Sequence, residues 1–512
     1  MYNKTICSSL SGLTCTPVTV ESDICDGMPV FDMVGYLGSE VKEARERVRT
    51  ALKNSGVHLP AKRITVNLSP ASIRKQGTAY DLATAISVMS CLLLIPQEAL
   101  DDIMIIGELS LSGDVMGVTG ILPRVMEARR LKLDRCMIPL ANLAEASLVS
   151  DIEIIPVSSL RQAADILCKN IKYAPAAPAS LSSMIQSQAV PGEDFSEING
   201  QSLLRRALEV SAAGLHNVVM SGPPGSGKSM AAKRLPSILP PLSYDEILEL
   251  TGIYSAAGKL PAGGVITTRP FVAPHHSSGA AALAGGGLIP RPGAISLAHR
   301  SILFLDELPE FSPQALESLR QPLEEHKVTL MRSAQSYTFP ADFLLVGAMN
   351  PCKCGYYPDL SRCSCSPGAI SRYLSRISGP IWDRIDIFTN AKELSFNEIT
   401  YSNKNEPSCV IRSRVMAARE RQAFRFRDSA ISCNGRMNTG QINLHCRLGH
   451  KEMLLLEEAH KRMSLSARAF NKILKLSRTI ADLDSSDDIK ESHLCEAIGY
   501  MDRSSISPFR HS

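Results

Sequence analysis

The chain reads VVMSGPPGSGKS from Val218 to Ser229, and this stretch predicts more about the fold than any other part of its 512 residues. It fits the phosphate-loop pattern G-x-x-x-x-G-K-[ST], with a short apolar strand before the loop and helix-compatible residues after it. Glycines let the backbone curl so that successive N–H groups face one anion, and the dipole of the following helix adds to the same spot. The pattern therefore predicts a nucleotide site on a strand–loop–helix unit of an α/β fold.

The residues of this loop have separate expected roles. We expect the loop as a whole to bind ATP, through Gly222, Pro223, Pro224, Gly225, Ser226, Gly227, Lys228 and Ser229. Lys228 is expected to reach the β- and γ-phosphates, and the Ser229 hydroxyl to bind Mg²⁺. The alternative is a Gly- and Pro-rich turn with an incidental lysine, and the ordered strand, loop and helix signals argue against it.

A second element follows at 301–307, with the sequence SILFLDE. Its apolar run is typical of a central parallel strand that is covered on both faces. At the carboxyl end of this strand, Asp306 is expected to hold Mg²⁺ through water, and Glu307 to polarise the attacking water. Taken alone, the acidic pair fits an ordinary strand-to-loop exit as well. Together with the phosphate loop, it predicts the Walker B element of an NTP-hydrolysing enzyme.

Composition is that of an ordinary globular protein with several domains, at 44% hydrophobic and 21% charged residues. The net charge of +4 is too small to indicate a nucleic-acid partner, so any basic face must be local. The first residues lack the apolar core of a signal peptide, and the apolar stretch at 91–95 is too short to span a bilayer. We therefore expect a cytoplasmic protein with no membrane partner, whose 14 cysteines are mostly reduced.

Four regions follow one another along the chain. Residues 1–172 alternate strand and helix signals, with strands expected at 63–68 and 104–111 and a buried helix at 81–95. An Ala-, Pro- and Ser-rich stretch without periodicity predicts a linker at 173–194. Residues 195–392 carry the nucleotide motifs, and 407–508 are helical in pattern.

The segment between the two nucleotide motifs is rich in Gly, Pro and His. It includes RPFVAPHHSSG at 269–279 and three glycines at 285–287, so it cannot form one continuous helix. His275 and His276 have no carboxylate or cysteine at metal-ligand spacing. An insertion or loop role is therefore favoured over a metal site.

With these motifs assembled, the chain resembles the ComM/YifB family of magnesium-chelatase-like AAA+ ATPases. Beyond the phosphate loop, the resemblance rests on APHH at 273–276, SLAH at 296–299, LDELPEF at 305–311, AMNPC at 348–352, SGP at 378–380, DRID at 383–386, LSARA at 465–469 and RTIADL at 478–483. It extends to EARERVR at 43–49 and RITVNL at 63–68, and so covers essentially the whole chain.

The resemblance implies an AAA+ P-loop ATPase core with a helical lid, preceded by an α+β domain similar to Lon proteases (ribosomal S5 domain 2-like). It implies three further catalytic residues: Asn350 as sensor 1, Arg384 as an arginine finger and Arg468 as sensor 2. Taken alone, Asn350 fits a cap, and each arginine fits a surface ion pair. A finger that acts on a neighbouring subunit implies a ring, and family members of this type are usually hexamers.

The N-terminal domain is not expected to be a protease. Lon-type proteases use a Ser-Lys dyad. Here Thr78 lies in the expected nucleophile region and Arg124 in the lysine region. Arginine stays protonated and cannot act as a base. We therefore expect a scaffold or a partner-binding unit.

Four cysteines within a short stretch, Cys352, Cys354, Cys363 and Cys365, form two C-x-C pairs. In a cytosolic chain this favours a tetrahedral Zn²⁺ site over disulfides, although each pair is tighter than the usual C-x₂-C. A cysteine-lined loop without metal stays open as the alternative.

The resemblance implies an ATP-driven motor on single-stranded or branched DNA, of the helicase type that performs branch migration during recombination or natural transformation. The alternative is a chelatase-like remodeller of proteins, which the absence of a D-x-S-x-S motif disfavours. The expected DNA contacts lie in the insertion from Arg269 to Arg291 and in 327–333, which alternates like a hairpin strand and offers Lys327 and Arg332 to phosphates. These charges equally fit a solvated hairpin.

Overall fold

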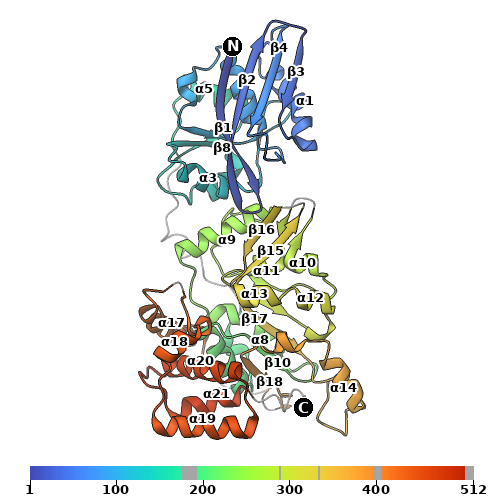
Figure 1. The fold of residues 1–512 in the computed structure, drawn as a ribbon, viewed down its shortest axis with the longest axis vertical. Helices are drawn as coiled ribbons and strands as arrows, with labels where there is room; N and C mark the ends of the chain where they lie inside the picture. The colour runs from blue at the N-terminus through green and yellow to red at the C-terminus, as the bar shows by residue number, and fades with distance from the viewer. Residues whose placement is uncertain are drawn as a thin grey trace.

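The computed structural model describes residues 1–175, 193–287, 290–332, 335–396, 398, 405–429 and 431–501. Most of the expected linker at 173–194 lies outside the described residues, as does the end of the expected helical region at 502–508. Figure 1 shows an N-terminal region at the top, a central region that contains the phosphate loop, and a group of C-terminal helices below. The mixed α/β class that the sequence predicts is confirmed.

The N-terminal region is built on a seven-stranded sheet with the order β3-β4-β2-β1-β5-β8-β9. Its strands are β1 (Tyr2–Ser11), β2 (Thr14–Cys25), β3 (Val30–Val34), β4 (Arg63–Ser69), β5 (Ile103–Ile105), β8 (Arg135–Pro139) and β9 (Glu153–Val157). The pairs β1–β2 and β2–β4 are antiparallel, and the other pairs are parallel. Helices α1 (Ser39–Asn54), α2 (Asp81–Cys91), α3 (Ile121–Arg130), α4 (Leu143–Ala146) and α5 (Leu160–Leu167) accompany this sheet, and β6 (Glu108–Leu109) pairs with β7 (Val115–Met116).

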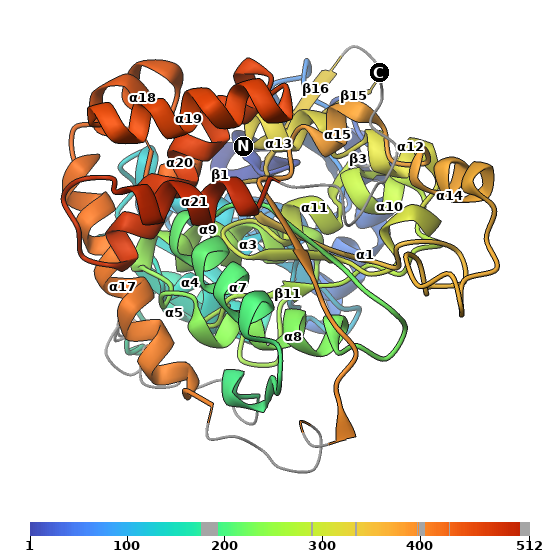
Figure 2. The ribbon, with the colours of Figure 1, turned by 90° about the horizontal axis from the view of Figure 1, so that it is seen from below.

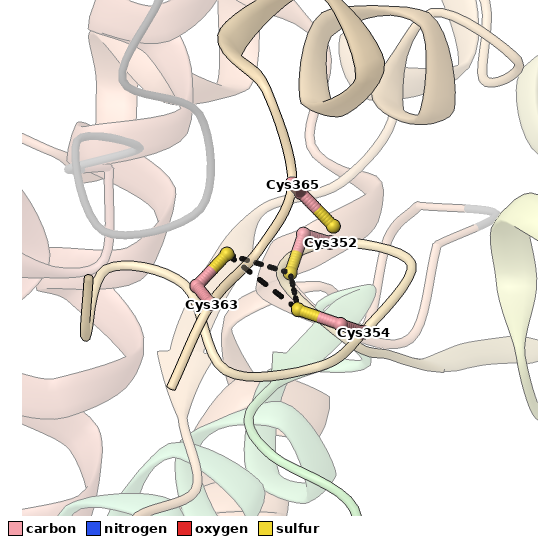
Figure 3. Close-up of side chains that lie close together, drawn as sticks. All are labelled: Cys352, Cys354, Cys363 and Cys365. Atoms are coloured by element: carbon pink, nitrogen blue, oxygen red, sulfur yellow. Dashed lines mark hydrogen bonds between the residues drawn. The ribbon is translucent and has the colours of Figure 1, made fainter. Parts of the chain in front are cut away.

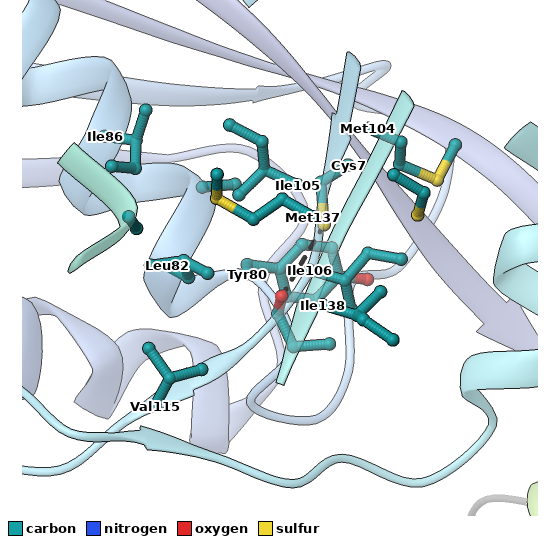
Figure 4. Close-up of a cluster of buried hydrophobic side chains, with 14 of the residues drawn as sticks. Cys7, Tyr80, Leu82, Ile86, Met104, Ile105, Ile106, Val115, Met137 and Ile138 are labelled. Carbon is teal, nitrogen blue, oxygen red and sulfur yellow. Dashed lines mark hydrogen bonds between the residues drawn. The ribbon is translucent and has the colours of Figure 1, made fainter. Parts of the chain in front are cut away.

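Helix α2 fills the centre of this region because each of its residues is buried. Figure 4 shows its Leu82 and Ile86 together with Tyr80, Ile105 and Met137 in the apolar cluster. The strand expected at 63–68 is confirmed as β4, and the expected helix ends at Cys91, short of 95. Leu93 has φ +61°, which ends the helix. The strand expected at 104–111 is interrupted between β5 and β6, so that expectation was only partly right.

The central region contains a five-stranded parallel sheet with the order β11-β14-β17-β10-β18. The strands are β11 (Phe271–Val272), β14 (Ile302–Leu305), β17 (Leu344–Met349), β10 (Val218–Ser221) and β18 (Ile387–Asn390). Every residue of β10, β14 and β17 is buried, as their continuous apolar sequences predict for strands covered on both faces. Because the strands are parallel, the loops that follow them meet at one edge of the sheet.

Helices and two hairpins surround this sheet. The helices are α7 (Ser202–Gly214), α8 (Lys228–Arg234), α9 (Tyr244–Ala257), α10 (Ala280–Ala284), α11 (Ala294–Leu297), α12 (Pro313–Glu317), α13 (Arg320–Glu325), α14 (Pro367–Leu374) and α15 (Gly379–Trp382). The hairpin strand expected from Lys327 is confirmed as β15 (Lys327–Arg332), which pairs antiparallel with β16 (Gln335–Pro340). The insertion forms short pieces, α10 and the β12 (Gly285–Gly286)–β13 (Arg291–Pro292) pair, and no continuous helix among its described residues.

The C-terminal residues form the expected helices, namely α17 (Ser408–Arg425), α18 (Thr439–His445), α19 (His450–Met463), α20 (Ala467–Leu483) and α21 (Glu491–Gly499). Seen from below, they gather on one side of the central region (Figure 2). Their apolar side chains share a core with α7, α8 and strand β10. None of the helices in the described part of the chain has both the length and the apolar character that a bilayer crossing needs.

Helix α9 joins the N-terminal and central regions. Its sequence begins with a capping box of Ser243 and Glu246, and its residues Ile247 and Leu250 belong to the apolar core of the N-terminal region. The backbone N–H of Gly120 donates to the carbonyl of Ser255 at 3.1 Å, directly before α3. Helix α9 is therefore shared by the two regions, which also meet where Gly12 lies against Tyr337 and Phe339 of β16.

Candidate nucleotide site

The phosphate loop has the backbone that its glycines predict. Gly225 and Gly227 have φ +77° and +83°, in the left-handed region that favours glycine. A Cβ on Gly222 would lie 2.2 Å from the carbonyl oxygen of Ala391, so only glycine fits there. The loop therefore depends on its glycines both for its curled backbone and for its close packing against the residue that follows strand β18.

Lys228 joins the phosphate loop to the end of strand β17. Its Nζ donates to the carbonyl oxygens of Gly222 at 2.7 Å and Pro223 at 2.8 Å, and to Oδ1 of Asn350 at 3.3 Å. Burial lowers the pKa of Lys228 to about 8, and the nearby carboxylate of Asp306 opposes that shift. The ammonium group thus sits where the loop and the expected sensor residue meet.

The two expected magnesium ligands contact each other. The Ser229 hydroxyl donates to Oδ2 of Asp306 at 2.6 Å, which joins the first turn of α8 to the end of β14. Hydroxyl and carboxylate oxygens are hard donors of the kind that Mg²⁺ prefers. The residues present therefore fit a magnesium ion held beside the nucleotide phosphates.

Glu307 contacts a residue that the sequence had not assigned to the site. Its Oε2 lies 3.1 Å from Nδ1 of His276, and the His276 ring packs on that of His275 with centroids 4.1 Å apart. Glu307 has φ +53°, so the chain turns sharply after β14. His276 follows the neighbouring strand β11, so it meets Glu307 only through the order of the sheet. The histidine pair was noticed in the sequence, but nothing local connects it with the acid.

The two expected arginines lie together, away from these contacts. Arg384 forms an ion pair with Glu324, and its side chain is only 12% exposed. Arg468 lies 3.5 Å from Asp383, and burial together with the charges of Arg468 and Arg320 lowers the pKa of Arg384. Among the described contacts, neither arginine touches the phosphate loop of its own chain. The structure thus brings together Lys228, Ser229, Asp306, Glu307 and Asn350, and leaves Arg384 and Arg468 in a second group.

The four cysteines converge from two stretches of one loop (Figure 3). Their Sγ atoms all lie within 4.8 Å of one another, with 3.2 Å between Cys352 and Cys354, 3.5 Å between Cys354 and Cys363, and 3.7 Å between Cys352 and Cys363. Although burial opposes it, hydrogen bonds from the Tyr356 backbone amide and the neighbouring thiols lower the pKa of Cys354 to about 6. The loop therefore presents a compact sulfur cluster in which a thiolate is stabilised.

The N-terminal region does not assemble the dyad of a Lon-type protease. Arg124 is buried and donates to the backbone oxygen of Ser8 and, at 3.2 Å, to its hydroxyl. Thr78 instead donates to Glu108. The two residues thus have separate partners, and neither is a base for the other.

Comparison with known proteins places these features in one family. The pattern of "Magnesium chelatase, subunit ChlI" matches 194–399, that of "Subunit ChlI of Mg-chelatase" matches 20–142, and the ChlI C-terminal pattern matches 405–501. The chain is 39% identical to the YifB protein of Salmonella typhimurium over 492 residues, which cover 96% of this chain and 95% of that protein. It is also 39% identical to the competence protein ComM of Haemophilus influenzae, over 96% of this chain and 95% of that protein.

The chain belongs to the ComM/YifB family of magnesium-chelatase-like AAA+ ATPases. ATPase activity follows from membership of this family. A separate match to the archaeal Lon protease of Methanocaldococcus jannaschii reaches 32% identity over 109 residues, 21% of this chain and 16% of that protein. This partial match fits the Lon-like character expected of the N-terminal region of this ComM/YifB member.

Proposed function

We propose that this protein is an ATP-driven, ring-forming motor that acts on DNA in the cytoplasm, as a helicase in branch migration during recombination or natural transformation. The observation that carries the ATPase part is the meeting of Lys228, Ser229, Asp306, Glu307 and Asn350 at one edge of the parallel sheet. The name of the ComM relative, a competence protein, favours DNA as the track.

Each residue of this group has a chemical task. Ser229 and Asp306 would hold Mg²⁺, which would supply positive charge to offset that of the phosphates when bound. Lys228 binds the β- and γ-phosphates with its ammonium group, and Asn350 fixes that group and the attacking water through its amide. Glu307 accepts hydrogen bonds from the water and orients it, with its carboxylate positioned by His276.

The assembly we propose is a homo-oligomer, a hexamer, in which each Arg384 acts on the neighbouring subunit. Arg384 and Arg468 make their described contacts with Glu324 and Asp383, outside the phosphate-loop group. A guanidinium is suited to the charge that spreads over the transferred phosphoryl group. The catalytic set is therefore completed only when a second subunit is present.

Two basic loops are proposed to contact the DNA backbone. Arg332, at the end of β15, and Arg291, in β13, are both exposed. A Cβ on Gly286 would lie 3.9 Å from Nη2 of Arg332, so the hairpin and the insertion are adjacent. Phosphate contacts need positive charge without base-specific geometry, which these loops offer.

We also infer that Cys352, Cys354, Cys363 and Cys365 bind one structural Zn²⁺. A tetrahedral site with Zn–S bonds of about 2.3 Å separates its sulfurs by about 3.8 Å. The sulfur distances of 3.2, 3.5 and 3.7 Å lie near this value and far from a disulfide bond. Elemental analysis of protein purified without chelator or metal-affinity resin should give one zinc per chain.

The motor proposal is tested by steady-state ATPase measured with single-stranded, duplex and branched DNA and without DNA. We expect DNA to stimulate turnover, and binding to weaken as salt rises. If the protein assembled with ATP neither binds DNA at low salt nor responds to it, the alternative of an ATP-dependent protein remodeller, similar to a chelatase motor, replaces the DNA motor.

A further inference from the structure

The cysteine loop lies directly against the phosphate loop. A Cβ on Gly355, between the two cysteine pairs, would lie 2.5 Å from Cδ and 2.9 Å from Cγ of Pro224. Gly355 has φ +89°, so the position is restricted to glycine by its backbone as well. The loop that contains the sulfur cluster therefore packs closely against the phosphate loop.

A second contact joins the cysteine loop to the segment that follows strand β18 and packs against the phosphate loop. Arg362 packs on the ring of Tyr356, with its guanidinium carbon 4.0 Å from the ring centroid, and forms a 2.8 Å ion pair with Glu393. Glu393 closely follows Ala391, whose N–H donates to Ser221 at 2.7 Å and whose carbonyl leaves room only for glycine at 222. The cysteine loop thus contacts the phosphate loop at Pro224 and, through Glu393, the segment that packs against Gly222.

A third connection runs through the backbone. Cys352 follows Asn350 after a single residue, and Asn350 accepts a hydrogen bond from Lys228. The first cysteine pair therefore begins two residues after Asn350, the expected sensor residue, which directly follows strand β17. Asn350, the partner of Lys228, is therefore only two peptide bonds away from a residue of the sulfur cluster.

The sulfur cluster lies in a loop that has no regular secondary structure and is otherwise linked by short turn hydrogen bonds, such as that from the Gly355 N–H to the Cys352 carbonyl at 3.0 Å. All residues of this loop from 351 to 366 are described, and none of them belongs to a helix or a strand. Only Cys352 among the four cysteines is fully buried, so the loop has little apolar core of its own. Backbone N–H groups of Tyr356 and Cys365 donate to the sulfurs of Cys354 and Cys363, an arrangement that suits metal-bound thiolates.

We propose that zinc bound by the four cysteines holds this loop against Pro224 and Asn350, and thereby sets the affinity of the phosphate loop for ATP. The proposal rests on the zinc site proposed above and gives it a task in nucleotide binding. Without the metal, the cysteine loop no longer supports the phosphate loop. The nucleotide itself must then order the phosphate loop when it binds. Affinity then falls, because ordering on binding costs free energy.

The first test removes the metal from the intact protein. Zinc is stripped with a zinc-selective chelator in excess Mg²⁺, zinc is counted by elemental analysis, and the Kd of a fluorescent ATP analogue is measured before stripping, after it and after zinc is restored. We expect Kd to rise about ten-fold on stripping and to recover with zinc. Less than a tenth of an equivalent of metal in the native protein overturns the zinc site itself. A full equivalent with an unchanged Kd after stripping overturns only the coupling.

The second test keeps the zinc and disturbs the contact. Gly355→Ala places a methyl group against Pro224, and we expect it to retain zinc, to raise Kd and to raise KM for ATP more than it lowers kcat. The matched control is Gly56→Ala, which has a similar φ of +87° with nothing within 4 Å of the added Cβ. This control introduces the same backbone strain in the N-terminal region.

Rescue separates the contact from a general loss of stability. Pro224→Ala removes the Cδ and Cγ atoms that the new methyl group would meet, so the double variant should bind ATP more tightly than Gly355→Ala alone. Zinc content and circular dichroism of each variant report on folding. A double variant no better than the single one, with both folded and zinc-loaded, contradicts the proposed contact.

Discussion

The imidazole Nδ1 of His276 lies 3.1 Å from Oε2 of Glu307, which places a histidine of the insertion on the expected catalytic base. We expect His276→Ala to lower kcat for ATP hydrolysis about ten-fold with little change in ATP affinity, because the carboxylate loses its positioning partner. Steady-state kinetics and nucleotide binding by the same protein preparation measure both effects.

Two reference variants calibrate that measurement. Glu307→Gln should bind ATP and barely hydrolyse it, whereas Lys228→Ala should weaken ATP binding itself. His275→Ala keeps the His276 side chain but removes the ring on which it packs, so it reports how much of the effect comes from a disturbance of the insertion. Faster hydrolysis by His276→Ala would mean that the histidine restrains Glu307, and hydrolysis at the native rate would mean that the contact has no role.

The ion pair between Arg384 and Glu324 holds the expected arginine finger within its own chain. We expect Arg384→Ala to abolish turnover and to leave nucleotide binding nearly intact. Mixing it with Lys228→Ala should restore part of the activity, because an intact Lys228 and an intact Arg384 then meet across some interfaces. Activity of the mixture is measured over a range of ratios, after subunit exchange has been shown with labelled protein. A failure to recover activity at every ratio contradicts action between subunits.

The adjacent basic loops give a prediction for DNA. Arg332→Ala and Arg291→Ala should each lower DNA-stimulated ATPase and branch migration and leave basal ATPase in place, and each should reduce the salt dependence of binding by about one phosphate contact. The control is Lys461→Ala, which removes a similarly exposed charge on α19, away from both loops. An equal loss in the control would assign the effect to overall charge.

Asp81 makes the stability of the N-terminal region depend on pH. Burial raises the pKa of this carboxyl to about 6, and the 2.9 Å contact with Arg47 opposes that shift only in part. A carboxyl with a folded-state pKa above its unfolded value binds more protons in the folded protein, so the free energy of unfolding rises as pH falls from 7 to 4. This contribution of Asp81 is lost as pH rises through 6.

The size of that effect is about 3 kcal/mol at most, from the difference between the two pKa values. Urea unfolding at several pH values, followed by a probe in the N-terminal region, should show this slope in the native protein. Asp81→Asn should flatten it, while Asp32→Asn, which removes a more exposed carboxylate, should not. A slope that persists in Asp81→Asn would assign it to other carboxyls.

The sequence predicted best where function depends on a short run of residues. The phosphate loop and the acidic strand end could both be predicted because each combines a strand with polar residues at fixed spacing. In the folded chain the sheet brings Ser229 to Asp306. The fold class was accessible for the same reason, since continuous apolar runs such as 302–305 predict buried parallel strands. The roles assigned to these residues stay predictions.

Contacts between distant segments had no comparable signal. His276 meets Glu307 because β11 lies beside β14, an order that no local pattern reveals. Two further contacts likewise depend on the assembled fold, namely the close packing of Gly355 on Pro224 and the ion pair of Arg384 with Glu324. The break between β5 and β6 was not predicted, because the sequence from Met104 to Leu111 has the apolar content of one continuous strand.

Helix α9 has a practical consequence for dissecting this protein. Ile247 and Leu250 of α9, and Leu242 just before it, are buried in the core of the N-terminal region, although strand β10 of the ATPase sheet precedes them along the chain and its other strands follow. Truncation at the linker would uncover these side chains and leave an exposed stripe of apolar surface on the isolated ATPase fragment. An engineered fragment would need polar replacements along that stripe before its aggregation or inactivity could be attributed to the missing domain.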